Sequence, residues 1–202
     1  MKKKCDNSNM RAKIACRVLA VRELGEPARV LDLYHGRGHV WRRVSEYLRV
    51  DELCGVDIEP RDIATLRLSA MRAIKNLPIE RFNVFDLDPY GSCFGEYSAL
   101  CDRLSGGPPR RVVVAMTMAF RCAGACVPKS LWDALGVPVE HRPNLSPFSA
   151  EDLFRLAILL FAHTWRPERI WSYHDSRRLY ISGVGSTNAM RPMEAATNAD
   201  DL

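Results

Sequence analysis

The sequence predicts an α/β fold, a mostly parallel seven-stranded sheet with helices on both faces. Short apolar runs without a helical period alternate with segments of helical spacing, giving five strands in succession. This alternation is typical of a parallel sheet whose strands are joined by right-handed helical crossovers. Two more strand-like runs, separated by four residues, follow near the C-terminus and predict a closing antiparallel hairpin.

A helix is expected first, from Met10 to Val21, because apolar residues recur at helical spacing from Ile14 on. It should end before Glu26-Pro27 and pack on the edge of the sheet. Residues 29–34 then form a nearly continuous apolar run, as expected of a strand buried on both faces.

The alternation continues to residue 116. Helical spacing returns at 40–48, and the run at 53–58 indicates a second strand. The elements expected next are a short helix at 61–63, a strand at 64–68, a helix at 70–76, a strand at 82–87, a helix at 96–104 and a strand at 111–116. The last run is the most β-branched in the chain and should be a central strand.

Residues 120–148 break this rhythm with four prolines and two glycines, and predict an ordered insertion over one end of the sheet. Ser149 to Asp152 resembles a capping box at the start of a helix. The core face of that helix should consist of Leu153, Ala157, Leu160 and Phe161. The hairpin strands are expected at 169–173 and 178–184.

The chain therefore divides into an N-terminal tail and helix at 1–26, one domain at 27–184 and a disordered tail at 185–202. No run of about eighteen apolar residues is present among the 202, which excludes an integral membrane protein. Three lysines near the N-terminus are followed by polar Asn7-Ser8-Asn9 rather than by the apolar segment of a signal peptide. The expected location is the cytoplasm.

Charge and cysteine content give little information about what the protein binds. The net charge of +5 permits a polyanionic partner but also serves solubility. The seven cysteines form no spaced disulfide framework, in keeping with a reducing compartment. Cys122, Cys126 and His141 lack the second ligand pair of a metal site, so no metal is expected.

Functional residues are sought at the strand exits, because ligands of open parallel α/β sheets bind outside the carboxyl ends of the strands. After the first strand come Gly36 and Gly38, which let the backbone approach a ligand closely. A dinucleotide loop would have a third glycine at position 41, where this chain has Trp. Asp57, nineteen residues beyond Gly38, ends the second strand and suits a ribose diol.

The fourth strand ends in the segment D-L-D-P-Y-G, residues 86–91. A carboxylate and a carbonyl there can accept the hydrogens of a planar amine, and the Tyr90 ring can stack on its heterocycle. Asp88 is interpreted as a catalytic carboxylate in preference to a residue that only forms an Asx-Pro turn. Asp86 is a second catalytic candidate. Alternatively, it is only a buried structural carboxylate.

In this order, the three exits resemble those of class I S-adenosylmethionine-dependent methyltransferases, over residues 27 to about 184. Residues 30–38 resemble the first motif of that family in the variant D-x-x-x-G-x-G. The segment D-L-D-P-Y-G-S at 86–92 most resembles the catalytic motif of the tRNA guanine-N2 dimethyltransferases. The resemblance implies a Rossmann-like fold, S-adenosylmethionine as cofactor and methylation of an exocyclic nucleobase amine, with RNA expected in preference to DNA.

The same resemblance implies roles for individual residues. Around the cofactor it places Asp32, Tyr34, Gly36, Gly38, Asp57, Ile58, Ser69, Ala70, Met71 and Asp88. In the catalytic motif it places Asp86, Asp88, Pro89 and Tyr90. The chain departs from the family in several respects. The tRNA enzymes are longer and carry an additional RNA-binding domain, and Tyr90 stands where most DNA amino-methyltransferases have a second proline. Ser69 stands where an aspartate is more usual, and His35 and Arg37 are unusual in the glycine loop.

Two other functions remain open from the sequence. One is a small-molecule or protein methyltransferase, and the other is a non-catalytic module that binds S-adenosylmethionine. Two arginine pairs, Arg110-Arg111 and Arg177-Arg178, are candidate phosphate contacts, although a solvated surface is the commoner role of such pairs. Oligomeric state is not indicated.

Overall fold

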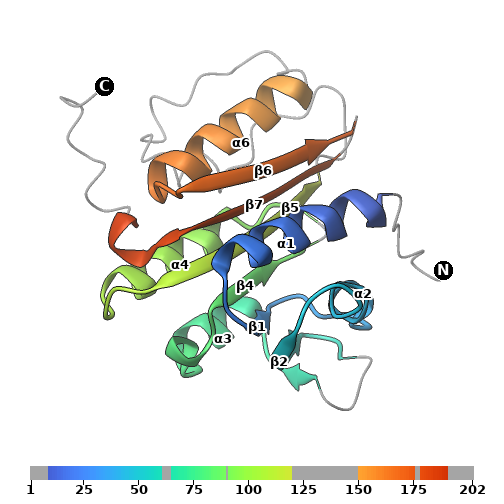
Figure 1. Cartoon of the computed structure of the whole chain (residues 1–202), viewed down its shortest axis with the longest axis vertical. Coiled ribbons are helices and arrows are strands. Elements are labelled where there is room, and N and C mark those ends of the chain that lie inside the picture. Colours follow the sequence, from blue (N-terminus) through green and yellow to red (C-terminus); the bar gives the residue numbers. More distant parts are fainter. Residues whose placement is uncertain (1–8, 61–64, 90, 120–149, 176–177, 191–202) are drawn as a thin grey trace.

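A seven-stranded sheet in the order β3-β2-β1-β4-β5-β7-β6 forms the centre of the fold (Figure 1). The computed structural model describes residues 9–60, 65–89, 91–119, 150–175 and 178–190. Strands β1 to β5 are parallel, and β7 is antiparallel to both of its neighbours, β5 and β6. The mostly parallel sheet with a closing antiparallel hairpin is therefore confirmed.

The strands lie close to the expected positions, and β5 is central, between β4 and β7. Nearly every residue of β4, β5 and β7 is buried, which explains why these strands are visible in the sequence as apolar runs. Their bounds are β1 Ala28–Asp32, β2 Val50–Asp57, β3 Leu66–Arg67, β4 Val84–Leu87, β5 Arg111–Ala119, β6 Arg169–His174 and β7 Arg178–Ser186.

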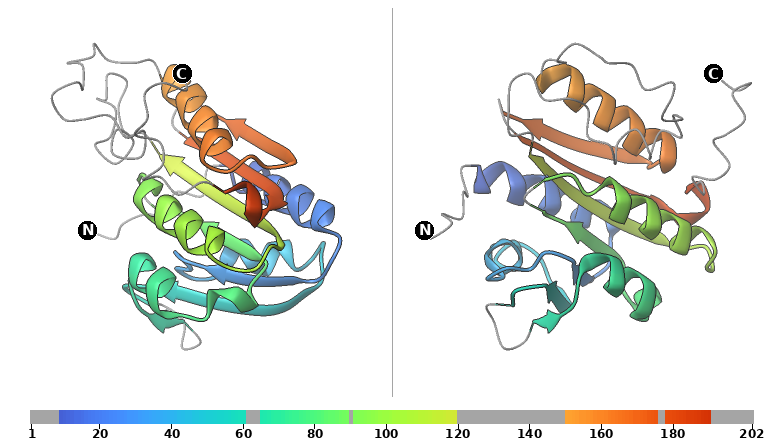
Figure 2. Two further views of the ribbon diagram at one scale, coloured as in Figure 1. Left: turned by 90° about the vertical axis from the view of Figure 1, so that its left-hand side faces the viewer. Right: turned by 180° about the vertical axis from the view of Figure 1, so that it is seen from behind.

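Helices cover both faces of the sheet (Figure 2). One face carries α1 (Met10–Leu24) and α2 (His39–Val44), whose apolar side chains form one buried cluster with β1, β4 and β5. The other face carries α3 (Ala70–Asn76), α4 (Phe94–Ser105) and α6 (Ala150–Thr164), which share the larger cluster. Ala157, Leu160 and Phe161 of α6 are buried there as expected.

Helix α1 differs from expectation in its position. It lies on a face of the sheet, against β5, β6 and β7, rather than on an edge (Figure 1). The physical reason is that its buried side includes Lys13 and Arg17 in addition to Val18 and Val21. Their burial depends on acidic partners in and just after β4, which a local apolar pattern does not reveal.

The described structure also continues beyond the predicted end of the domain at residue 184. Strand β7 runs to Ser186 and is followed by the short 3-10 helix η3 (Thr187–Ala189). Thr187 holds this segment in place, because its N–H donates to the Arg110 carbonyl at 2.8 Å and its hydroxyl accepts from the Arg110 N–H at 3.1 Å. The predicted disordered tail therefore does not begin at residue 185.

Other differences concern element bounds. Helix α2 ends at Val44 rather than at residue 48, β2 begins at Val50, and a second short 3-10 helix, η1 (Ile79–Arg81), precedes β4. The predicted helix at 61–63, the insertion at 120–148 and the cap residue Ser149 lie outside the described residues. Among the residues that are described, no helix has the length and apolarity to cross a bilayer.

Candidate cofactor and acceptor site

The exits of β1, β2 and β4 lie side by side at one edge of the sheet. Asp32, the last residue of β1, is in register with Gly55 of β2 and with Asp86 of β4. Chain order reverses between β1 and β4, and ligands of open α/β sheets bind at such a reversal. The sequence-predicted acidic residues are thus brought together at this edge.

The loop after β1 is held by the Asp32 carboxylate. One of its oxygens accepts a hydrogen bond from the Tyr34 N–H at 3.3 Å, and the other lies 2.9 Å from His35 Nδ1. Burial raises the pKa of Asp32 to about 6, and the charge of Asp86 acts in the same direction, while the hydrogen bond to His35 opposes the shift. Asp32 is therefore a structural support of the loop.

Gly36 and Gly38 are required by the backbone of this loop, with φ angles of 57° and 66°. At Gly38 there is a second reason, since a Cβ atom would lie 2.7 Å from His35 Nε2. The His35 ring also covers Gly55 of β2, where a Cβ would lie 2.5 Å from His35 Cγ. Gly55 was not predicted as a site residue, although a glycine inside a strand signals such close approach.

Asp57 joins the exits of β1 and β2. Its Oδ2 accepts a hydrogen bond from the Gly36 N–H at 2.9 Å, and its Oδ1 accepts one from the Glu59 N–H at 2.8 Å. Because each carboxylate oxygen has two lone pairs, both retain the capacity to accept a further hydrogen bond. The half-buried side chain is therefore able to bind a diol at the surface.

A cavity of about 430 Å³ lies beside Asp57, at the exits of β2 and β3. Two of its lining residues, Ile58 and Ser69, are among the predicted cofactor contacts; the others are Arg67, Leu68 and Arg72. Ser69 also caps α3, since its hydroxyl accepts from the Arg72 N–H at 3.3 Å. Ala70 is buried and Met71 is half-buried at the start of that helix.

Tyr34 packs against the larger apolar cluster, on the face of the sheet that carries α4. Burial, followed by the charge of Glu96, raises the pKa of Tyr34 well above its ordinary value. The phenol is therefore neutral near neutral pH.

Asp86 is a structural residue, which corrects the expectation that it could be catalytic. It is 1% exposed and receives Arg17 Nε at 2.7 Å, Arg17 Nη2 at 2.6 Å and Trp41 Nε1 at 2.7 Å. Burial would lower the pKa of Arg17, but the Asp86 carboxylate raises it above its ordinary value, so the guanidinium is charged. A carboxylate enclosed in this way does not reach a substrate.

Asp88 is more accessible, with 17% of its side chain exposed just beyond the end of β4. Lys13 Nζ lies 2.8 Å from Oδ1 and 2.7 Å from Oδ2. The same ammonium lies 5.7 Å from the centroid of the Tyr180 ring. Neither Lys13 nor Arg17 was predicted as part of this region; their i, i+4 spacing within a helix was the only sequence signal.

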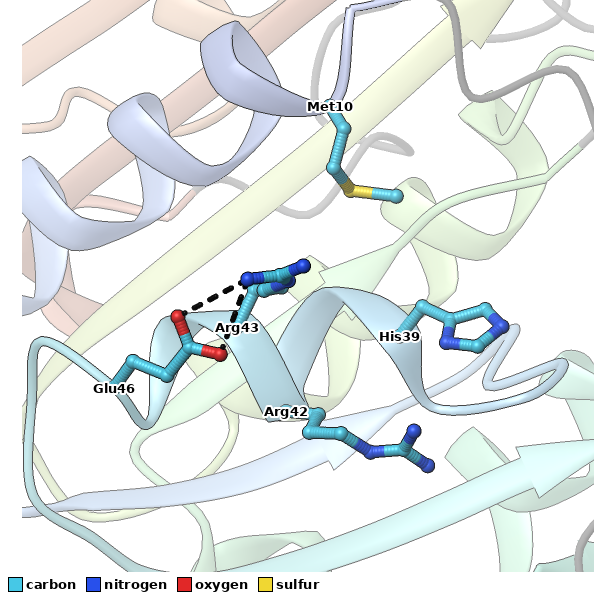
Figure 3. Close-up of a pocket in the computed structure, with 5 residues that line it drawn as sticks. All are labelled: Met10, His39, Arg42, Arg43 and Glu46. Carbon is cyan, nitrogen blue, oxygen red and sulfur yellow. Dashed lines mark hydrogen bonds and ion pairs between the residues drawn. The ribbon is translucent and has the colours of Figure 1, made fainter.

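A second cavity, of about 520 Å³, lies between α1 and α2. Figure 3 shows Met10 reaching into it from α1, with His39, Arg42 and Arg43 coming from α2 and Glu46 from the residues after it. Arg43 is 3.4 Å from both carboxylate oxygens of Glu46. Basic side chains thus dominate this cavity.

The candidate phosphate contacts Arg110 and Arg111 are bound to other groups of the protein. Arg110 donates to backbone carbonyls, including that of Ile79 at 3.1 Å, and Arg111 donates to Glu168 at 2.6 Å and to the Glu23 carbonyl at 2.7 Å. Both arginines lie at the opposite end of the sheet, where β5 begins. Their guanidinium groups donate to partners within the protein.

Some residues considered in the sequence analysis lie outside the described residues. They are Tyr90, Arg177 and the cysteines at 122 and 126. Pro89 is half-buried beside Asp88. Within the described part of the chain, no three His, Cys, Asp or Glu side chains are grouped to hold a metal ion.

Comparison with known proteins gives a fold but no family model. Neither a family model nor a curated protein sequence matches the chain. Among solved structures, the 1,6-didemethyltoxoflavin-N1-methyltransferase of Burkholderia thailandensis, determined with bound S-adenosylhomocysteine, has a TM-score of 0.53 at 16% identity. The comparison covers 89% of this chain and 79% of that one. The fold of this chain is therefore similar to that of this methyltransferase.

A second solved structure agrees with this methyltransferase fold. It is an S-adenosylmethionine-dependent methyltransferase of Archaeoglobus fulgidus, with a TM-score of 0.50 at 13% identity, covering 88% of this chain and 94% of that one. At these identities the likeness concerns the fold alone. The chemistry of this chain has to be argued from its own residues.

Proposed function

We propose that the protein is an S-adenosylmethionine-dependent methyltransferase that acts on an exocyclic amine of a nucleobase, with guanine N2 in RNA as the first candidate. The observation that carries the proposal is the partly exposed Asp88 carboxylate at the end of β4, two strands from Asp57 at the same edge of the sheet. The methyltransferase fold supports the class of reaction. The motif around Asp88 supports the amine.

The residues at the exits of β1 and β2 fit the proposed cofactor. The cavity beside Asp57 has the size of a small-ligand site and offers Ile58 as an apolar surface for a planar ring. Asp57 has lone pairs left for the two hydroxyls of a ribose. At Gly36 a Cβ would meet no atom closer than 3.9 Å, so the loop backbone is open to a ligand there.

When bound, S-adenosylmethionine supplies a methyl group as an electrophile. The task of the protein is then to orient the amine, whose lone pair is delocalised into the base. Asp88 accepts one N–H hydrogen bond, and the carbonyl of Pro89 accepts the other, so that the lone pair points toward the methyl group. The proton that the methylated nitrogen must lose has the Asp88 carboxylate as its acceptor.

An RNA partner is proposed on the basis of the cavity between α1 and α2. Its lining of His39, Arg42 and Arg43 suits phosphate oxygens, to which arginine donates paired hydrogen bonds. Because Lys13 and Met10 lie one turn apart on α1, this cavity neighbours the Asp88 side of the site. A single-stranded or loop base would enter without the free energy needed to flip a paired one.

The test is a single-turnover assay with the preformed cofactor complex, radiolabelled S-adenosylmethionine and tRNA transcribed in vitro. Asp88→Ala should lower methyl transfer by about a hundredfold or more and leave cofactor affinity within a few-fold. The matched control is Asp51→Ala, an acid at the other end of β2. Full activity in Asp88→Ala would refute the amino-group mechanism.

Repeating the assay with a cell extract that contains RNA, proteins and metabolites separates the other functions. Label recovered in a metabolite or a protein, with none in RNA, would indicate a small-molecule or protein methyltransferase. Tight cofactor binding with no transfer to any acceptor would indicate a binding module. Nucleoside mass spectrometry of labelled RNA would identify the modified base.

A further inference from the structure

Lys13 forms a two-point contact with the residue on which the proposed reaction depends. Its ammonium lies within 2.8 Å of both Asp88 oxygens, and the lysine side chain is only 11% exposed. The Tyr180 ring, on the antiparallel strand β7, covers the ammonium at 5.7 Å. A lysine enclosed by a carboxylate and an aromatic face has given up most of the freedom of an ordinary surface lysine.

The Lys13–Asp88 contact is one of two ion pairs between α1 and the end of β4. Lys13 and Arg17 are one helical turn apart, about 6 Å along α1, and Asp86 and Asp88 are two residues apart in the chain, about 6.6 Å in an extended segment. Helix and strand therefore bring two cations and two carboxylates into register, with Arg17 opposite Asp86 and Lys13 opposite Asp88. The inner pair is fully buried, and the outer pair reaches the surface.

The outer pair is one of several contacts that attach α1. The helix is already held by the buried Arg17–Asp86 pair and, at its start, by a hydrogen bond from Asn9 to Asp175. Apolar residues such as Val18 and Val21 pack it against the sheet. What Lys13 does restrict is the Asp88 carboxylate itself.

We infer that Lys13 is a positioning residue for Asp88, which fixes the orientation in which the carboxylate meets the substrate amine. A carboxylate accepts about four hydrogen bonds, two on each oxygen. Lys13 occupies one position on each oxygen and leaves one on each for the amine. This inference rests on the proposed function, because it assigns Lys13 a role in the same reaction.

A double-mutant cycle tests whether Lys13 acts through Asp88. Methyl transfer to in vitro transcribed tRNA is measured in single turnover for Lys13→Met, Asp88→Asn and the double variant. Removing both partners leaves no uncompensated charge, so the double variant should fold even if Lys13→Met is unstable. Lys13→Arg is the conservative variant, and Arg11→Met, an exposed position on the same helix, is the control.

Lys13→Met should lower the rate at saturating RNA by about tenfold or more, with cofactor affinity unchanged within about threefold. Lys13→Arg should recover most of the rate, and Arg11→Met should retain it. In the Asp88→Asn background, Lys13→Met should reduce the rate by less than about threefold, because its target is already gone.

An equal loss in both backgrounds would overturn the inference, as would a normal rate in Lys13→Met beside an inactive Asp88→Asn. If Lys13→Met alone does not fold, Asp88→Asn and the double variant are compared, and a further loss in the double variant would overturn it. A normal rate in Asp88→Asn would instead refute the proposed function, and the role of Lys13 with it.

Discussion

Arg17 of α1 and Asp86 of β4 form a two-point ion pair in the interior, with side chains that are 0% and 1% exposed. Trp41 of α2 donates to the same carboxylate at 2.7 Å. Two helices and a strand therefore meet at one buried charge. Because Asp86 is two residues before Asp88, this contact also determines where the exit of β4 lies.

Arg17→Met should destabilise the protein by about 3–5 kcal/mol, because the buried Asp86 carboxylate would be left without its counter-ion. Urea unfolding at neutral pH measures the change. Arg22→Met, at an exposed position of the same helix, should change the free energy of unfolding by less than about 0.5 kcal/mol. A decrease below about 1 kcal/mol in Arg17→Met would contradict the structural importance of the pair.

Gly38→Ala should destabilise the protein more than Gly36→Ala. Both substitutions place a side chain in the left-handed region, at about 1–2 kcal/mol, but at Gly38 the new Cβ also meets the His35 ring. In a His35→Ala background the extra destabilisation at Gly38 should disappear, as thermal or urea unfolding of the four variants would show. Equal effects at the two glycines with His35 present would argue against this packing.

Asp57→Ala should weaken S-adenosylmethionine binding by about 1.5–3 kcal/mol, because it removes the carboxylate proposed to bind the ribose. Isothermal titration calorimetry measures the affinity. Asp57→Asn keeps one side-chain oxygen, which can accept from the Gly36 N–H, but loses the oxygen that accepts from the Glu59 N–H and the negative charge. Unchanged affinity in both variants would remove the assignment.

Asp32 should make stability depend on pH between about 4 and 6. Its pKa of about 6 lies above the ordinary value of 3.8, so the folded protein binds this proton more tightly than the unfolded chain. The contribution is present at acid pH and is lost as pH rises through about 6. The stability of wild type minus that of Asp32→Asn should fall by about 2 kcal/mol from pH 4.5 to pH 7.

Urea unfolding at the two pH values tests the Asp32 prediction. Asp51→Asn serves as the control, since that residue lies at the exposed start of β2 and should show no such trend. A difference between wild type and Asp32→Asn that stays constant or rises with pH would refute the direction of the shift.

The double variant Arg42→Gln/Arg43→Gln should weaken RNA binding and make it less dependent on salt. Removing one arginine–phosphate interaction lowers the slope of log affinity against log salt by about 0.7–0.9, so a reduction of about 1–2 is expected. Fluorescence anisotropy at several salt concentrations gives this slope. Arg155→Gln, on α6, is the control, and an unchanged slope in the double variant would exclude the cavity as a phosphate site.

Local patterns predicted the sheet well because buried parallel strands are short apolar runs whose identity does not depend on distant residues. Helix α3 was predicted with the observed bounds, and the structure shows Ser69 capping its start. The position of α1 was not predictable in this way. The acids that bury Lys13 and Arg17 lie 75 and 69 residues further along the chain.

The candidate site shows the same division. Gly36, Gly38 and Asp57 follow or end strands directly, so their spacing indicated a common edge. The packing of His35 against Gly55 joins two separate strands and has no signature in a single segment. Asp86 and Asp88 are chemically identical and two residues apart, and only the buried Arg17 and Trp41 distinguish them.

The position of helix α1 also constrains the order in which this protein can fold during its synthesis. It leaves the ribosome before the strands of the sheet, yet it packs on β5, β6 and β7, and Asn9 bonds to a residue 166 positions later. A nascent chain that has released only β1 to β4 offers α1 the acidic partners in and just after β4 and part of its apolar cluster. It does not yet offer the surface of β5, β6 and β7, so the final contacts of α1 must wait until the hairpin is synthesised. Truncation before β7 should therefore leave Lys13 without its place over Tyr180 even where the loop after β1 has already formed.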